Sequence, residues 1–189
     1  MAFIAVALTL CGGSSETRSA NAASKDECAT NLTSMWWLLK DWVGDGDTFP
    51  PGLSSLAESA TNLDLFICSG SGRRAPPSAS ITNVDAWSDY IYVANQRDTP
   101  PDMVPLLISP PENHGGHYGY VVWNYSSKAA QLPASRIRAL VVTPWCMETN
   151  ATELQLQMLK EEIVVRVPDH LRKFYPNPYR AKGAFETTK

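Results

Sequence analysis

The sequence lacks the short patterns that mark several common classes of enzyme and binding protein. None of its four cysteines forms a C-x-x-C pair, which argues against a zinc ribbon or a thioredoxin-like redox site. The G-x-S-x-G and Cys-Gly-x-Cys-Trp patterns of hydrolytic nucleophiles and the G-x-x-x-x-G-K phosphate loop are missing. No cluster of lysine and arginine interleaves with aromatic residues, and the net charge is only -3. We therefore expect a protein that is not an enzyme, has no catalytic residues, takes no cofactor and binds no nucleic acid.

The sequence also lacks an apolar run long enough to span a membrane. Residues 1–10 (MAFIAVALTL) are apolar, but a membrane-spanning helix needs roughly 20 such residues. Three interpretations stay open: a signal peptide cleaved after Ala22, a lipoprotein signal with Cys11 as the lipidated residue, or the remnant of a longer membrane helix. We favour the remnant, and we expect residues 1–22 to be an export or truncated membrane segment.

What the sequence does contain is typical of one globular domain. The chain has 189 residues, of which 44% are hydrophobic and 19% are charged, so it can bury an ordinary core. Its 14 prolines and 11 glycines lie mostly between residues 44 and 119 and predict loops and short strands there.

The clearest helical pattern covers residues 24–43. Ser24 and Glu27 form a capping box at its predicted start, and glycines and a proline follow its end. The apolar residues that share one face of this helix are Leu32, Met35, Trp36, Leu39 and Val43. We expect the tryptophans of this segment to cover a sheet, because aromatic rings supply large apolar contact areas.

Short strands are predicted after this helix. Residues 63–68, 87–94, 104–108 and 118–123 are rich in β-branched, aromatic or aliphatic residues and are bounded by Gly, Pro, Asn or Ser. Residues 129–132 are expected to pair with residues 118–123 across a turn. Short helices are expected at residues 52–60 and 133–140, and an amphipathic helix at residues 152–166. The predicted fold is α+β, with a long amino-terminal helix packed on a small, mainly antiparallel sheet.

Five short motifs, in this order, resemble those of one protein family. They are Cys28-Ala-Thr-Asn-Leu32, Asp47-Thr-Phe-Pro50, Phe66-Ile-Cys68, Ser88-Asp-Tyr-Ile-Tyr92 and Asn113-His-Gly-Gly116. Together they are similar to motifs of bacterial type II secretion pseudopilins and type IV pilin-like proteins. The resemblance extends over about residues 24–146 and implies a pilin-like fold.

One subfamily, called prepilin-type processing-associated, carries a histidine, nine residues and then Asp-Gly. Here nine residues separate His114 from Asn124-Tyr125, so the spacing is kept and the final pair is changed. Because Asn124 tolerates positive φ and Tyr125 does not, we expect a wider turn than Asp-Gly makes. The resemblance thus implies a structural motif of His114, Gly115, Gly116 and Asn124. The Gly-Phe cleavage site of a prepilin, its early glutamate and its long apolar helix are missing.

The resemblance implies a non-enzymatic pseudopilin-like protein of the cell envelope, periplasmic or membrane-anchored, or a secreted one. Its implied partners are other pseudopilin or pilin-like subunits or secretion components, and its amino-terminal segment provides the membrane association. The expected organisation is a globular domain at residues 23–150 and a helical extension at residues 151–189. The alternative function is a secreted or lipid-anchored binding module that reuses the pilin-like fold.

The cysteines and histidines leave two chemical questions open. In an oxidising compartment we expect Cys68 and Cys146 to form the disulfide, since Cys28 begins the helical motif and Cys11 lies in the export segment; buried free thiols are the alternative. His114 and His117 could ligate zinc or copper if a third ligand approached. We instead favour a structural role without metal, in which the ring nitrogens of His114 bind backbone groups of a glycine-rich loop.

Overall fold

A five-stranded antiparallel sheet forms the centre of the α+β fold in the computed structural model, which describes residues 15–44, 46–76, 81–98, 104–142 and 164–176. The strands are β1 (Ile91–Ala94), β2 (Pro105–Ser109), β3 (Tyr118–Trp123), β4 (Ala129–Pro133) and β5 (Val164–Arg166). Their order across the sheet is β4-β3-β2-β1-β5. The three middle strands are almost wholly buried, because helices cover both faces of the sheet.

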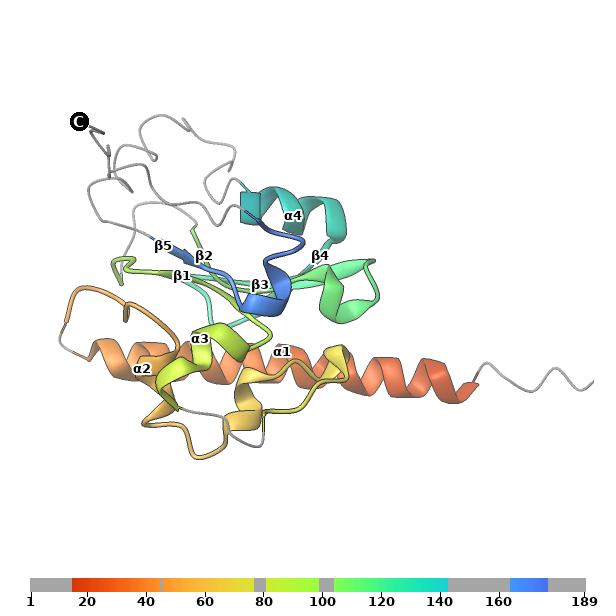
Figure 1. Ribbon diagram of the computed structural model, residues 1–189, viewed down its shortest axis with the longest axis horizontal. Coiled ribbons are helices and arrows are strands. Elements are labelled where there is room, and N and C mark those ends of the chain that lie inside the picture. The colour runs from red at the N-terminus through yellow and green to blue at the C-terminus, as the bar shows by residue number, and fades with distance from the viewer. Residues whose placement is uncertain (1–14, 45, 77–80, 99–103, 143–163, 177–189) are drawn as a thin grey trace, which may run out of the picture.

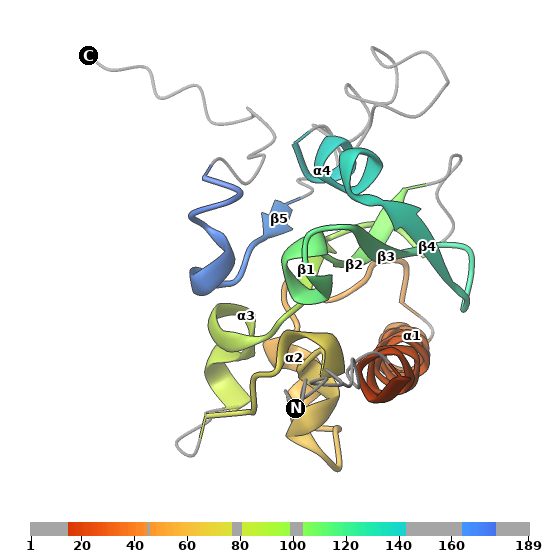
Figure 2. The same ribbon diagram turned by 90° about the vertical axis from the view of Figure 1, so that its right-hand side faces the viewer.

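Helices divide between the two faces of the sheet. Figures 1 and 2 show α1 (Ser15–Val43), α2 (Ser54–Ala57) and α3 (Val84–Trp87) on one side and α4 (Ala134–Val142) on the other. Side chains alternate between two cores accordingly: Tyr92 of β1 belongs to the core beneath α1, while Val93 belongs to the core beneath α4. The result is a three-layer arrangement with the sheet in the middle.

The predicted apolar face of α1 is confirmed. Leu32, Met35 and Leu39 are fully buried, and Trp36 and Val43 are nearly so. The expectation that all the tryptophans of this helix cover the sheet is wrong, because the exposed fractions of Trp37 and Trp42 are 55% and 45%. Both residues lie off the i, i+3, i+4 stripe that the core selects.

The start of α1 differs from the expected one. The helix begins at Ser15 rather than at residue 24, so Ser24 lies inside it and does not cap its start. Alanine has the highest helix propensity of all residues, and Ala20, Ala22 and Ala23 favour the extra turns. Within the described residues, no helix combines the length and apolar character needed to cross a membrane.

Two predicted strands are corrected near α2 and α3. Residues 63–66 form the 3₁₀ helix η1 (Leu63–Phe66), because the Asn62 side chain accepts a hydrogen bond from the Asp64 N–H at 2.9 Å and winds the backbone. Of residues 87–94, only Ile91–Ala94 form a strand, since α3 runs to Trp87. The strands predicted at 104–108, 118–123 and 129–132, and the helices at 52–60 and 133–140, are confirmed within two or three residues at most ends.

The carboxyl-terminal segment contributes an edge strand. Val164–Arg166 form β5, which pairs with β1 at Val93 and Val165. The helix predicted over residues 152–166 is therefore wrong for its last three residues, and residues 152–163 lie outside the described ones. Part of the predicted extension thus completes the sheet of the globular domain.

Candidate functional site

A group of polar side chains is buried between α1 and one end of the sheet. Cys28 comes from α1, Cys68 lies just before the 3₁₀ helix η2 (Ser69–Ser71), Ser109 ends β2 and His114 ends the 3₁₀ helix η4 (Pro111–His114). Cys28, Cys68 and Ser109 are fully buried, and the exposed fraction of His114 is 7%. Three separate parts of the sequence, around residues 28, 68 and 109–114, therefore bring these four side chains to the same place.

The four side chains are in mutual contact. The two sulfur atoms lie 3.0 Å apart. The Nε2 atom of His114 is 3.6 Å from the Cys28 Sγ, 3.5 Å from the Cys68 Sγ and 3.0 Å from the Ser109 Oγ. The Ser109 Oγ is in turn 3.5 Å from the Cys28 Sγ and 3.6 Å from the Cys68 Sγ. We call Cys28, Cys68, Ser109 and His114 the thiol cluster.

Local sequence explains how His114 comes to point inward. Pro111 occupies the first turn of η4, where its fixed φ fits and its missing N–H costs nothing. The helix stops at Gly115 and Gly116, whose φ values of +66° and +85° are left-handed. Asn113 anchors the turn, because its Nδ2 donates to the Asp89 carbonyl at 2.7 Å. The predicted glycine-dependent turn is thus present, and it delivers the imidazole to the thiol cluster.

The partners of the His114 ring differ from the expected ones. Its Nε2 contacts side chains of the thiol cluster rather than loop backbone, and its Nδ1 has no hydrogen-bond partner among the described residues. The ring also stacks on Tyr118, with 4.9 Å between the ring centroids. His117 is exposed, and the groups close enough to share a metal ion in the described residues are Cys28, Cys68 and His114.

Asn124, the last residue of the predicted motif, lies at the other end of β3 from His114. Its Nδ2 donates to the Gln96 Oε1 at 2.9 Å and to the Arg97 carbonyl at 2.8 Å, and its N–H donates to the Val104 carbonyl at 2.9 Å. These bonds fasten the β3–β4 turn to the connection between β1 and β2. The residues of the predicted motif therefore lie at two separate places in the fold, at opposite ends of β3, and do not form one site.

The two thiols of the cluster differ in proton affinity. The hydrogen bond between the sulfurs lowers the pKa of Cys68 to about 5, against the effect of burial, and His114 adds to the lowering. The same hydrogen bond, together with burial, raises the pKa of Cys28 well above its ordinary value. The contact between the two sulfurs therefore shifts their pKa values in opposite directions.

A buried carboxylate, that of Asp89, binds the backbone of Cys68 next to the thiol cluster. Asp89 is fully buried and accepts a hydrogen bond from the Cys68 N–H at 3.1 Å. It pairs with Arg73, and its Oδ1 lies 3.3 Å from the His170 Nε2. Burial raises the pKa of Asp89, but hydrogen bonds from His170 and Ser71 and the Arg73 charge outweigh this and leave the pKa below its ordinary value.

The proximity of Cys28 and Cys68 was missed in the sequence, although a signal for it exists. Cys28 precedes Leu32 by four residues, so it continues the buried stripe of α1 by one turn. Cys146 lies outside the described residues, and its bond to Cys68 stays a prediction. No comparable signal placed Ser109 or Asp89, since a single polar residue in an apolar segment does not reveal its partners.

Comparison with protein-family models, with curated proteins and with solved structures finds no match to the chain. The fold is that of an α+β domain with an antiparallel sheet between helical layers. Its distinctive chemical feature is the buried thiol cluster.

Proposed function

We propose that this chain is a non-enzymatic, pseudopilin-like subunit of a cell-envelope assembly of the type II secretion or type IV pilus kind. The observation that carries the proposal is the arrangement of α1. The helix lies against one face of the sheet through its buried stripe, while its amino-terminal part extends beyond the domain, as Figure 1 shows. The sequence resemblance implies such a helix for a pilin-like subunit: one part packs on the globular domain and the other part extends beyond it.

The exposed surface of α1 supports a role in packing against other subunits. Trp37 and Trp42 are 55% and 45% exposed, although they belong to the residue type that buries the most apolar area. Exposed tryptophans are enriched where protein surfaces meet. The partners in this proposal are other pseudopilin or pilin-like subunits or secretion components, and the segment before α1 supplies the association with the membrane.

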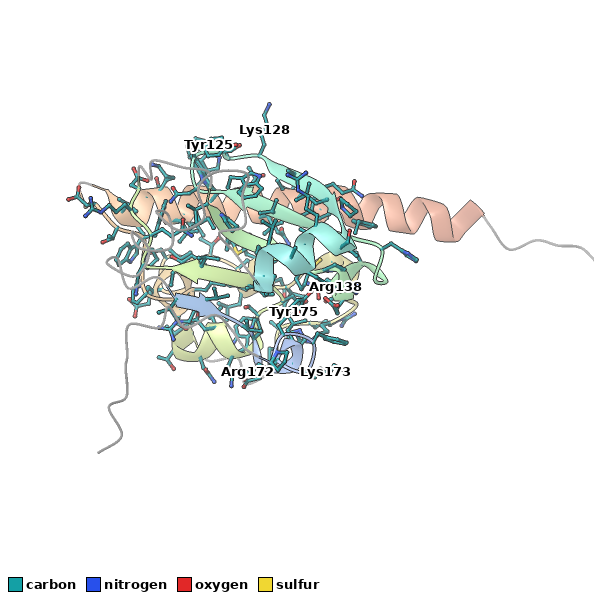
Figure 3. The ribbon with its side chains drawn as sticks, turned by 90° about the horizontal axis from the view of Figure 1, so that it is seen from above. Tyr125, Lys128, Arg138, Arg172, Lys173 and Tyr175 are labelled. Carbon is teal, nitrogen blue, oxygen red and sulfur yellow. The ribbon has the colours of Figure 1, made fainter. Side chains whose placement is uncertain are left out.

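Site-specific photocrosslinking tests this proposal. A photoreactive phenylalanine analogue replaces Trp37 in the protein expressed from its full reading frame in its native cells. The matched control replaces Tyr125, which lies at the β3–β4 turn (Figure 3) and is 57% exposed, close to the exposure of Trp37. We expect crosslinks from position 37 to another copy of the chain or to a pilin-like subunit, and few from position 125.

Mass spectrometry of the crosslinked products identifies the partner. Equal yields from the two positions, or recovery of the protein from the cytoplasm alone, would contradict the proposal. The upstream reading frame provides an independent check, because a pilin-like precursor encodes a Gly-Phe site followed by a complete apolar helix.

A groove beside α1 favours the alternative of a secreted or lipid-anchored binding module. It has a volume of about 870 Å³ and an open mouth, and it lies between α1 and the segment that contains η1 and η2. Its wall includes Asn31, Trp37, Leu65, Arg73 and Arg74, which offer an aromatic surface beside two cations. A crosslink from position 37 to a protein unrelated to pilins would favour this alternative.

A further inference from the structure

We propose that Cys28 and Cys68 form a disulfide bond that fastens α1 to the segment between η1 and η2. This inference rests on the export that the proposed function includes, because structural disulfides persist in oxidising compartments. It also replaces the pairing of Cys68 with Cys146 that the sequence alone suggested.

The fold brings these two sulfurs together from fixed positions. Cys28 sits within a helix, and the N–H of Cys68 is held by the buried Asp89. The sulfurs are 3.0 Å apart, so they need to approach by about 1 Å to reach the roughly 2.05 Å of a disulfide bond. Both residues are fully buried, and they are the two cysteines that the described part of the chain contains. Among the described residues, each is therefore the nearest cysteine to the other.

The domain encloses the pair. Both cysteines are fully buried, and besides Cys28 the nearest polar side chains to the Cys68 sulfur are those of Ser109 and His114. A disulfide formed there is shielded from reductants in solution, because thiol–disulfide exchange requires access to a sulfur atom.

The bond forms by thiol–disulfide exchange with a disulfide-bonded oxidoreductase of the envelope. The thiolate of one cysteine attacks the disulfide of the oxidant, forms a mixed disulfide and releases one thiolate of the oxidant. The second cysteine, as a thiolate, attacks the sulfur of the first and releases the other thiolate. Two electrons pass to the oxidant, whose disulfide becomes two thiols with the two protons of the cysteines. Because both sulfurs are buried in the folded chain, the exchange occurs before the domain closes.

The same atoms could ligate zinc or copper(I), but the surroundings of His114 favour the disulfide. A histidine that binds metal usually donates its other ring N–H to an acceptor. The Nδ1 of His114 has no such partner among the described residues.

The position of the bond suits the proposed function. Cys28 is the first buried residue among the described side chains of α1, so the bond lies at the amino-terminal end of the described buried stripe. A force applied to the amino-terminal part of α1 reaches this point before the rest of the stripe. The disulfide therefore keeps the helix and the domain together when the helix is pulled.

Peptide mapping without reductant tests the pairing in two samples of the full chain. One sample is isolated from native cells after free thiols are blocked. The other is denatured, reduced and refolded with oxidised and reduced glutathione, without and with one equivalent of zinc. We expect one linked peptide pair that contains Cys28 and Cys68, and its loss in Cys28→Ser and in Cys68→Ser. The matched controls Cys11→Ser and Cys146→Ser should keep the linked pair.

The possible outcomes distinguish a failure of the proposed disulfide from a failure of the proposed function. A bond between Cys68 and Cys146, free thiols at Cys28 and Cys68 in the refolded sample, or one tightly held zinc ion with both thiols unoxidised would overturn the pairing. If the refolded chain forms the bond while the cellular protein is reduced and cytoplasmic, the envelope location fails and the pairing stands. If the cellular protein lies in the envelope with both thiols free, the disulfide fails and the proposed function stands. Because the linked peptides are mapped in the wild-type chain, the test does not depend on whether any variant folds.

Discussion

Trp36→Ala should lower the free energy of unfolding by about 3–5 kcal/mol, as expected for a large-to-small change in a core. Trp36 is 8% exposed and belongs to the core between α1 and the sheet. Its Nε1 donates a hydrogen bond to the Asn124 carbonyl at 3.3 Å. The substitution therefore removes apolar contacts and also leaves a buried carbonyl group without this donor.

The magnitude follows from the area that the ring removes from water. A buried tryptophan covers about 150–250 Å², which at roughly 25 cal/mol per Å² corresponds to about 4–6 kcal/mol. The alanine that remains keeps a small part of this, and partial collapse of the cavity recovers more, so about 3–5 kcal/mol is left. Such a loss is a large fraction of the 5–15 kcal/mol that typically stabilises a domain.

Urea unfolding followed by far-ultraviolet circular dichroism measures the effect, because this signal does not depend on tryptophan fluorescence. Trp37→Ala is the matched control, since it removes the same side chain from the next position of α1, where the ring is 55% exposed. Its cost should stay below about 1 kcal/mol, as for surface substitutions. A cost below about 1 kcal/mol for Trp36→Ala, or equal costs for the two variants, would refute the packing of α1 described above.

Three further predictions concern polar contacts and a close approach. Asp85→Ala should cost about 1–3 kcal/mol in urea unfolding, because the carboxylate accepts hydrogen bonds from the N–H and hydroxyl of Ser54 at 3.1 and 2.7 Å; a loss below about 0.5 kcal/mol would contradict this. The pKa of Asp89 is lowered by folding, so its contribution to stability is present above the ordinary value of about 3.9 and is lost as pH falls through the lower folded pKa. Acid titration of stability should therefore show a decline below about pH 4 that is weaker in Asp89→Asn, and an identical decline in both proteins would argue against it. Gly70→Ala should cost about 1–3 kcal/mol by overpacking, because a Cβ there would lie 2.7 Å from the His114 Nδ1; unchanged stability would show that the loop can move away.

The sequence predicted those elements whose pattern and surroundings agree. The buried stripe of α1 and the strand at residues 118–123 could be read directly, because side chains of one periodicity face one core. The segment at residues 63–68 was misassigned for a local reason. Its aliphatic residues suit a strand, but the Asn62 side chain binds the Asp64 N–H and turns the chain into a 3₁₀ helix.

The thiol cluster could be predicted only in part. His114 was singled out from its glycine-rich context, yet its contacts with Cys28 and Cys68 depend on how α1 and two loops pack. Long-range contacts of this kind leave no periodic signal in a single sequence. The register of α1 was the one available clue, since it places Cys28 on the same face as Leu32.

The docking of α1 depends on more than its apolar stripe. Apolar contacts are not directional, so a stripe alone permits a helix to rotate or slide on a sheet. Polar contacts along α1 restrict these movements: Asn31 donates to a backbone carbonyl just before η2 at 3.2 Å, Trp36 donates to the Asn124 carbonyl, and Lys40 pairs with Asp98. These contacts bind α1 to three separate segments of the domain. Cys28 is the first buried residue among the described side chains of α1, and near it the Asn31 amide is the polar contact that restricts the helix. The proposed disulfide adds a covalent link at this point, so a load on the amino-terminal part of α1 meets it before the rest of the described stripe.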